Sequence, residues 1–289
     1  MPLPICYLNG NYLPLAEARV SPMDRAFLFA DAVYEVVPVY ASRPFRLREH
    51  LDRLNRSLAG IRMSAPLSHP DWAKLCQELI ARNSYRDAYL YLQVTRGAEP
   101  GRNHAWPEGL QPTLFAYVTA LEPVPEVFLK EGVSAVTAAD TRWARRDIKS
   151  TALLANILLK KLSADAGAFE TILLENGELT EGSSTTVHVV KDGVIRTPPN
   201  GHHILPGTTR DVVTELAARL NLRCASCSVT EKELRAADEI WLAFATRGVL
   251  PVTTLDGAAV GRGTPGPLFN RVSAAFADYT RELAGTPAL

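Results

Sequence analysis

The sequence lacks most of the features that mark secreted, membrane-bound or nucleic-acid-binding proteins. Its 289 residues include only four cysteines, too few for the disulfide framework of a small secreted domain. Lysine plus arginine and aspartate plus glutamate both number 31, so no net charge favours a nucleic acid or a membrane surface. The longest apolar run, TALLANILL, is too short to cross a bilayer. We therefore expect a small-molecule ligand, with neither nucleic acid nor membrane as a partner.

Targeting and metal motifs are also missing. The first residues, MPLPICYLNG, contain two prolines and no basic stretch, which is atypical of a secretory signal, so we expect a cytoplasmic protein. Cys224 and Cys227 form a single C-x-x-C with no second pair, so we expect no zinc or other metal site. The GRGTPG segment that begins at Gly261 has no strand–helix unit around it, which argues against a dinucleotide site.

Strand and helix patterns alternate in both halves of the chain. Residues 121–132, LEPVPEVFLKEG, contain two prolines that disfavour helix and central strand alike, so we predict a linker there. This gives a small N-terminal domain over 1–120 and a larger C-terminal domain over 133–289. Hairpins are predicted at Asn9-Gly10, Asn176-Gly177 and Asp192-Gly193, and helices over 46–58, 71–82, 151–164, 211–220 and 267–283. We predict a two-domain α/β (α+β) fold with a ligand cleft between the domains.

One of the seven lysines has an unusual setting. Lys149 lies in RWARRDIKSTALLANILL, just before an apolar helix that Ser150 or Thr151 could cap. The positive end of that helix and the charges of Arg145 and Arg146 disfavour the ammonium form of the lysine. A lysine that attacks an aldehyde needs its neutral amine, so Lys149 is a candidate for Schiff-base chemistry. A solvated lysine that merely precedes a helix fits the same pattern.

Two further segments offer groups for a phosphorylated cofactor. LTEGSSTTVHVV places Glu181 before four hydroxyl residues, 183–186. Pyridoxal phosphate needs an acidic partner for its ring nitrogen, and hydroxyls can bind its phosphate or ring hydroxyl. In ILPGTTRDVV, Gly207-Thr208-Thr209 opens a helix whose free N–H groups suit a phosphate. Taken alone, the first segment could be a polar turn between strands, and the second could be ordinary helix capping.

Together these segments resemble the fold-type-IV, or class IV, aminotransferases, which depend on pyridoxal 5′-phosphate. The resemblance extends from Tyr7 to Leu283, is closest to the D-amino acid subgroup, and is carried by DRAFLFADAVYEVVPVY, EHLDRL, QVTRGAEPGRNHAWP, DIKSTALLAN, LTEGSST and ILPGTTRDVV. It implies a homodimer of two-domain subunits, with a smaller α/β domain, a larger domain containing a β-barrel-like sheet, and the cofactor in the cleft between them. Ala30 and Ala32 depart from the pattern, because members often have glycine there.

The resemblance also implies roles for individual residues. Lys149 would hold the cofactor as a Schiff base and shuttle a proton to and from the substrate α-carbon, and Glu181 would bind the pyridine nitrogen. The other cofactor contacts would come from Arg53, Leu205, Gly207, Thr208, Thr209 and Thr246. Of these, Leu205 would pack on the ring and the others would bind the phosphate. Thr246 lies in FATRGVLPV, and an alignment of this segment shifted by one residue stays open as an alternative.

Arg102 and His104 define the subgroup. An Arg-x-His pair in this loop is typical of D-amino acid aminotransferases, where it would bind the substrate α-carboxylate together with Tyr34, reached from the partner subunit. An arginine fork binds a carboxylate at two points. We therefore expect ping-pong transfer of an amino group between a D-amino acid, such as D-alanine or D-glutamate, and a 2-oxo acid, such as 2-oxoglutarate or pyruvate. The alternatives are a branched-chain L-amino acid or (R)-amine transaminase, an aminodeoxychorismate lyase, or a non-catalytic binding protein.

Overall fold

The computed structural model describes residues 4–285 and divides into two compact units, each considered by itself. Within the described residues, the N-terminal unit contains residues 4–122, the segment Ile148–Leu153 and residues 283–285. The C-terminal unit contains Pro123–Asp147 and Leu154–Glu282. The division differs from the predicted one, because the segment that carries Lys149 groups with the N-terminal unit instead of with residues 133–289.

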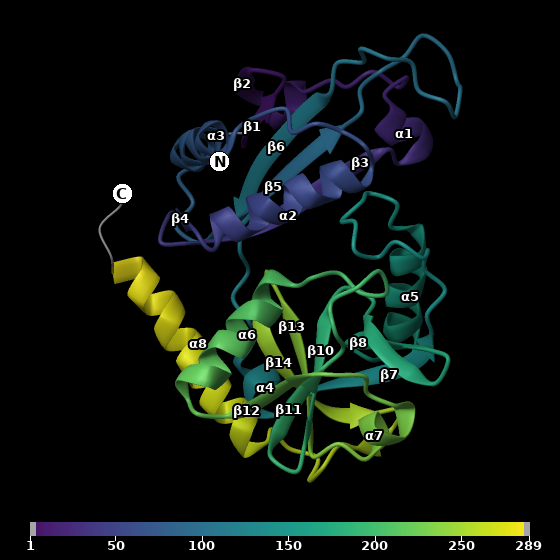
Figure 1. Ribbon diagram of the computed structural model, residues 1–289. Coiled ribbons are helices and arrows are strands. Elements are labelled where there is room, and N and C mark those ends of the chain that lie inside the picture. Colours follow the sequence, from purple (N-terminus) through teal and green to yellow (C-terminus); the bar gives the residue numbers. More distant parts are fainter. Residues whose placement is uncertain (1–3, 286–289) are drawn as a thin grey trace. The chain divides into compact units, whose positions relative to one another are not determined.

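Within the described residues, the N-terminal unit is built on a six-stranded antiparallel sheet with the order β2-β1-β6-β5-β3-β4. Its strands are β1 (Ile5–Leu8), β2 (Asn11–Pro14), β3 (Ala32–Tyr40), β4 (Arg43–Pro44), β5 (Ala88–Thr95) and β6 (Thr113–Ala120), as Figure 1 shows. Its helices are the 3-10 turn η1 (Leu15–Glu17), α1 (Arg25–Phe29), α2 (Leu47–Gly60) and α3 (His69–Asn83).

The core of this unit lies between the sheet and the helices α2 and α3. Leu51, Leu54 and Leu58 of α2 are buried in the same cluster as Val33 and Val37 of β3. Leucines three and four positions apart lie on one face of a helix, so the spacing that predicted α2 also determines which face it buries. Burial of these side chains fixes β3, which carries Tyr34 and Glu35, against α2, which carries His50, Arg53 and Ser57.

Within residues 4–285, the C-terminal unit contains a nine-stranded mixed sheet with the path β12-β11-β10-β13-β14-β7-β8-β9, and β15 pairs with β14. Figure 1 shows that this sheet curls. Its strands are β7 (Val133–Ala139), β8 (Glu170–Glu175), β9 (Glu178–Gly182), β10 (Thr186–Lys191), β11 (Val194–Thr197), β12 (Arg223–Ser226), β13 (Glu239–Phe244), β14 (Gly248–Leu255) and β15 (Ala258–Ala259). Its helices are α4 (Glu126–Lys130), α5 (Leu154–Asp165), α6 (Thr208–Arg219), α7 (Glu231–Arg235) and α8 (Pro267–Gly285).

Three predicted hairpins are confirmed, at Asn9-Gly10, Asn176-Gly177 and Asp192-Gly193, and all six turn residues have positive φ. The two-domain α/β architecture is likewise confirmed. Within residues 4–285, the helices are too short or too polar to span a membrane, and His, Cys, Asp and Glu side chains form no group that could hold a metal ion.

Candidate active site

Lys149 does not lie at a helix N-terminus, so this part of the sequence prediction was wrong. Helix α5 begins only at Leu154, beyond the reach of a helix dipole, which acts mainly within its first turn. Thr151 does not cap it: the Thr151 hydroxyl donates to the carbonyl of Ala30 over 3.1 Å. The chain before α5 is instead joined to β3, because Thr151 N–H donates to the carbonyl of Ala32 at the start of that strand, over 3.0 Å.

The two arginines that precede Lys149 have carboxylate partners of their own. Arg145 pairs with Asp147, with its Nε and Nη2 atoms each 2.9 Å from a carboxylate oxygen. Arg146 binds Glu175 through Nη1 and Nη2, at 3.0 and 2.8 Å. The proposed effect of these two charges on Lys149 is therefore not supported, because paired charges largely cancel.

The backbone of Lys149 is held by β3 and α2. Its N–H donates to Ser57 Oγ over 3.1 Å, and its carbonyl accepts from the N–H of Tyr34 over 3.0 Å. The next residue, Ser150, forms an antiparallel bridge with Val33. The Lys149 Nζ atom lies 4.4 Å from the centre of the Tyr34 ring, and within residues 4–285 no carboxylate pairs with it. A half-buried amine on a fixed backbone, unpaired with an acid, is well suited to act as a nucleophile.

Behind Tyr34 lies a buried cluster of Glu35, Arg53 and His50. Arg53 donates from Nε and Nη2 to the two carboxylate oxygens of Glu35, both over 2.7 Å, and His50 Nδ1 lies 2.7 Å from Glu35 Oε2. Burial raises the pKa of Glu35, but Arg53 and His50 outweigh it, and the net pKa lies well below its usual range. Burial also lowers the pKa of His50 against the pull of Glu35, with Arg53 and Lys149 adding to the effect. The two hydrogen bonds to Glu35 hold Arg53 by one edge of its guanidinium group.

Arg102 and His104 lie on the long loop between β5 and β6. Both are exposed, and both pack near Phe29 of α1. Arg102 Cζ is 4.9 Å from the Phe29 ring centre, and the His104 and Phe29 ring centres are 5.4 Å apart. Tyr34 stacks instead on Tyr91, with ring centres 5.6 Å apart. Within residues 4–285, no hydrogen bond, ion pair or ring contact joins Arg102 or His104 to Tyr34 or Lys149.

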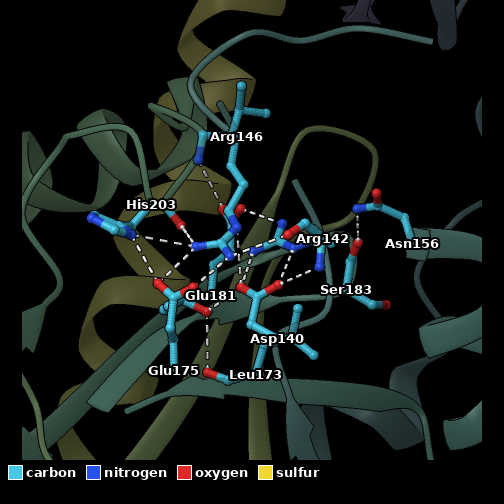
Figure 2. Close-up of polar contacts among 11 residues, drawn as sticks. Asp140, Arg142, Arg146, Asn156, Leu173, Glu175, Glu181, Ser183 and His203 are labelled. Carbon is cyan, nitrogen blue, oxygen red and sulfur yellow. Dashed lines mark hydrogen bonds and ion pairs between the residues drawn. The ribbon is translucent and has the colours of Figure 1, made fainter. Parts of the chain in front are cut away.

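In the C-terminal unit, Glu181 of β9 is the centre of a buried ionic network (Figure 2). Its Oε1 pairs with Arg142 Nη1 at 2.5 Å, and its Oε2 accepts from the N–H of Leu205 over 3.1 Å. The other edge of the Arg142 guanidinium donates to the carboxylate of Asp140 from Nε and Nη2, over 2.9 and 2.7 Å. Burial raises the pKa of Glu181, whereas Arg142 and the Leu205 N–H oppose the rise. Burial outweighs these partners, so the net pKa of Glu181 lies above its usual range, and Arg142 and the Leu205 N–H limit the rise.

The network extends outward to the surface. Thr180 donates to Asp140 Oδ2 over 2.7 Å, which adds a second donor to that buried carboxylate. Figure 2 shows Arg146 beside Arg142 and Asp140, with Glu175 and the exposed His203 beyond it; His203 Nδ1 is 2.8 Å from Glu175 Oε2. Positive and negative groups thus alternate from Glu181 to solvent. This alternation gives Arg142 and Arg146 carboxylate partners and fixes the orientation of Glu181.

Two of the four hydroxyls that follow Glu181 are not available to a ligand, contrary to the sequence prediction. Ser183 and Ser184 both donate to the buried carboxylate of Glu170, over 2.5 and 3.0 Å. Asn156 Nδ2 donates to the carbonyl of Ser183 over 2.7 Å. These contacts hold the turn after β9 in place. They leave only the last two hydroxyls of the run as possible ligand donors.

The start of α6 has the properties of an anion site. Its N-cap is Gly207, and no side chain caps the helix, so ordinary threonine capping is excluded. Thr208 and Thr209 are buried in its first turn. A Cβ atom at Gly207 would lie 2.6 Å from Thr186 Oγ1, which explains why a glycine is needed there. Uncapped N–H groups beside hydroxyls have the chemistry that suits an anion such as phosphate.

Thr246 lies in the turn between β13 and β14, half-buried. Ala243, near the end of β13, pairs with Thr186, so this turn lies at the end of the sheet that faces Thr186 and Gly207. Asp140, Arg142 and Glu35 were not predicted from the sequence. For Arg142 the sequence offered one cue, its place two residues after Asp140.

The comparisons with known proteins cover almost the whole chain. Residues 32–255 match the family described as amino-transferase class IV. D-alanine aminotransferase of Bacillus licheniformis is 42% identical over 268 residues, 93% of this chain and 94% of that protein. D-alanine aminotransferase of Staphylococcus aureus (strain MSSA476) is 36% identical over 274 residues, 94% and 96% of the two chains.

Solved structures show the same relationship. The branched-chain amino acid aminotransferase of Escherichia coli has a TM-score of 0.89 at 27% identity, covering 96% of this chain and 94% of that one. A branched-chain amino acid aminotransferase of T.th., solved with pyridoxamine 5′-phosphate, has a TM-score of 0.88 at 26% identity, covering 97% and 95%.

Proposed function

Because this chain belongs to the class IV aminotransferases, a pyridoxal-phosphate-dependent family, we propose that it transfers the amino group between a D-amino acid and a 2-oxo acid. D-alanine and D-glutamate are the proposed donors, and pyruvate and 2-oxoglutarate the proposed acceptors. The observation that carries the proposal is the 42% identity to a D-alanine aminotransferase over 93% of the chain. The Arg102-x-His104 pair adds to it, because an arginine fork recognises a carboxylate.

The residues present fit pyridoxal phosphate. Lys149 offers an amine without an acidic partner, Glu181 a buried carboxylate held by Arg142, and the start of α6 an uncapped helix end with two hydroxyls. When bound, the cofactor supplies an electron sink for the substrate α-carbon. Lys149 would hold it covalently and move the α-proton, and Glu181 would bind the ring nitrogen. Arg53, Gly207, Thr208, Thr209 and Thr246 would hold its phosphate, and Leu205 would pack on its ring.

Substrate recognition is assigned to Arg102, His104 and Tyr34. Arg102 binds the α-carboxylate at two points, which determines the face of the α-carbon that is presented to Lys149. In the proposed homodimer, Arg102 and His104 come from the partner copy. The selectivity for D-amino acids would then arise from the position of the carboxylate, because the same proton-transfer group serves either hand.

An exposed apolar stripe on α5 supports the homodimer. Its members lie on one helical face: Leu154, Ile157, Leu158 and Leu162, between 43% and 70% exposed. An apolar face of this kind is covered in most soluble proteins, and a two-fold contact covers it with an identical surface. We also propose that the protein resides in the cytoplasm, since its four cysteines, all among the described residues, are free thiols.

The decisive experiment follows the absorbance of the protein reconstituted with pyridoxal phosphate. Adding D-alanine should remove the long-wavelength band of the bound cofactor, and L-leucine should not. Pyruvate should then restore it, as ping-pong transfer requires. If only L-leucine acts, D-selectivity is wrong and a branched-chain activity, suggested by the similarity to branched-chain enzymes, takes its place.

A second measurement tests the assignment of Lys149. Borohydride reduction of the loaded protein, followed by peptide mass spectrometry, should place the phosphopyridoxyl group on the peptide that contains Lys149. Lys149→Ala should remove both the label and turnover, whereas Lys160→Ala, on the half-buried part of α5, should retain both. Label on another lysine, or turnover by Lys149→Ala, would show that the assigned chemistry is wrong.

A further inference from the structure

A buried arginine, Arg25, binds the backbone of the exposed loop that carries Arg102 and His104. Arg25, the first residue of α1, is only 3% exposed. Its Nη1 donates to the carbonyl of Asn103 over 2.7 Å, and its Nη2 to the carbonyl of His104 over 3.2 Å. Residues 101–109 are all exposed, so these two hydrogen bonds to backbone connect the tip of the loop directly to the body of the unit.

The charge of Arg25 is balanced before any ligand binds. Its Nε is 2.9 Å from Asp31 Oδ2, and its Nη1 also pairs with Glu99, at the start of the same loop. Asp31 in turn binds Arg96 through Nε and Nη2, at 2.7 and 3.0 Å. Arg96 Cζ lies 4.1 Å from the ring centre of Trp106. The loop is thus fastened before Arg102 by Glu99 and after it by Asn103, His104 and Trp106.

Phe29, one helical turn after Arg25, supports the side chains that the loop presents. Its ring centre is 4.7 Å from Arg25 Cζ, 4.9 Å from Arg102 Cζ and 5.4 Å from the His104 ring centre. Within residues 4–285, Arg102 itself has no acidic partner. The charge of Arg25 is therefore neutralised by Asp31 and Glu99, whereas the charge of Arg102 is not neutralised by an acid of the described residues. Arg25 thus serves the structure of the loop, and Arg102 keeps its charge for a ligand.

We propose that Arg25 is a positioning residue that preorganises the Arg102–His104 loop for the substrate carboxylate. The inference rests on the proposed function of that loop. Ordering a flexible segment at the moment of binding costs conformational entropy at each residue that becomes fixed. Because the anchor sets Asn103 and His104 during folding, that cost does not reduce substrate affinity. The binding of pyridoxal phosphate involves other residues, so loss of the anchor should weaken substrate binding selectively.

The test compares Arg25→Met with Arg19→Met. Arg19 is exposed, belongs to the same segment, and binds only the carbonyls of Ala16 and Ala18, so its substitution controls for loss of an arginine. Limited trypsin digestion measures cleavage of the Arg102–Asn103 bond, and steady-state kinetics measure KM and kcat for D-alanine. In Arg25→Met we expect cleavage at that bond to accelerate about tenfold or more, and KM to rise roughly 10–100-fold with a smaller change in kcat.

Arg25→Lys should behave like Arg25→Met, because one ammonium group cannot serve two carboxylates and two carbonyls. Glu99→Gln is the milder second variant, and should shift cleavage and KM in the same direction with the melting temperature retained. Wild-type cleavage and KM in Arg25→Met would overturn the proposal, and so would an equal loss of cofactor affinity. If the enzyme instead uses L-leucine, its KM is measured with that acid, which also carries an α-carboxylate. The D-amino acid assignment then fails while the role of Arg25 is still tested.

Discussion

Replacing Arg142 should destabilise the C-terminal unit far more than replacing Arg145, although the two residues are three positions apart. Arg142 is 6% exposed and lies between two carboxylates, Asp140 at 0% and Glu181 at 6%. Arg142→Met keeps much of the side-chain volume and removes the only guanidinium that contacts Glu181 in the described residues. Two buried acids would then be left with too few partners.

The expected loss follows from the geometry of the pair. Removing one member of a buried ion pair typically costs about 3–5 kcal/mol, because the remaining charge is desolvated and uncompensated. Asp140 retains Thr180 and a 3.5 Å contact with Arg146 Nε, whereas Glu181 retains only the Leu205 N–H, so most of the loss arises at Glu181. With a urea dependence of about 3 kcal/mol per M, the unfolding midpoint should fall by about 1–1.7 M.

Urea unfolding of the cofactor-free protein at pH 7.5 measures this shift. The exposed pair of Arg145 with Asp147 supplies the control, since Arg145→Met should leave the midpoint near that of the wild type. The double variant Arg142→Met/Glu181→Gln should recover part of the loss, because it removes the unpaired charge as well. A midpoint shift below about 0.3 M for Arg142→Met would refute the view that Glu181 depends on this ion pair.

Three further predictions concern other parts of the structure. His188 is fully buried, and burial, with a smaller contribution from Arg210, lowers its pKa to about 3 from the ordinary 6.5. As the pH falls below 6.5 the unfolded chain binds a proton that the folded chain does not, so the folded state should lose about 2 kcal/mol of stability between pH 7.5 and 5.0. Urea midpoints at both pH values measure this loss, and His188→Gln should not show it. Thr208→Val should raise the dissociation constant for pyridoxal phosphate about tenfold or more in a fluorescence titration. Thr214 lies on the same helix and its hydroxyl donates to a backbone carbonyl, so Thr214→Val should leave that constant unchanged. Equal affinities of the two variants would show that Thr208 does not bind the phosphate. Ile157→Asp should convert the proposed dimer to a monomer in sedimentation velocity, and a dimer that persists unchanged would place the interface away from the α5 stripe.

The parts of the fold that were predicted correctly from sequence are those determined by local chemistry. Asn9-Gly10, Asn176-Gly177 and Asp192-Gly193 predicted hairpins because both turn positions need positive φ, which few residue types adopt readily. The leucine spacing over 46–58 predicted a helix, and α2 spans Leu47–Gly60. In each case the residues that determine the structure are neighbours in the chain, so no knowledge of distant contacts was needed.

The segment around Lys149 was mispredicted because a distant strand determines its conformation. Ser150 and Thr151 before an apolar run predict a helix start, yet Ser150 pairs with Val33 and Thr151 donates to Ala32. Pairing with β3 satisfies backbone groups that a cap would have satisfied locally, and it is formed across more than a hundred residues. The same pairing fixes Lys149 beside Tyr34. The failure of the local prediction and the position of the candidate nucleophile therefore have one cause.

Charge partners were equally hidden from the sequence. Arg142, Arg145 and Arg146 lie within five positions, and nothing local distinguishes them. The path of the chain after β7 decides their roles, since it buries Arg142 between Asp140 and Glu181 and leaves Arg145 in solvent with Asp147. Glu181 was predicted as the acid from its sequence setting, but its partner Arg142 was not predicted. A lone buried carboxylate would tend to take up a proton. The fold opposes this with a guanidinium already in place, because Arg142 pairs with Glu181 and limits the rise that burial causes in the pKa of that carboxyl group.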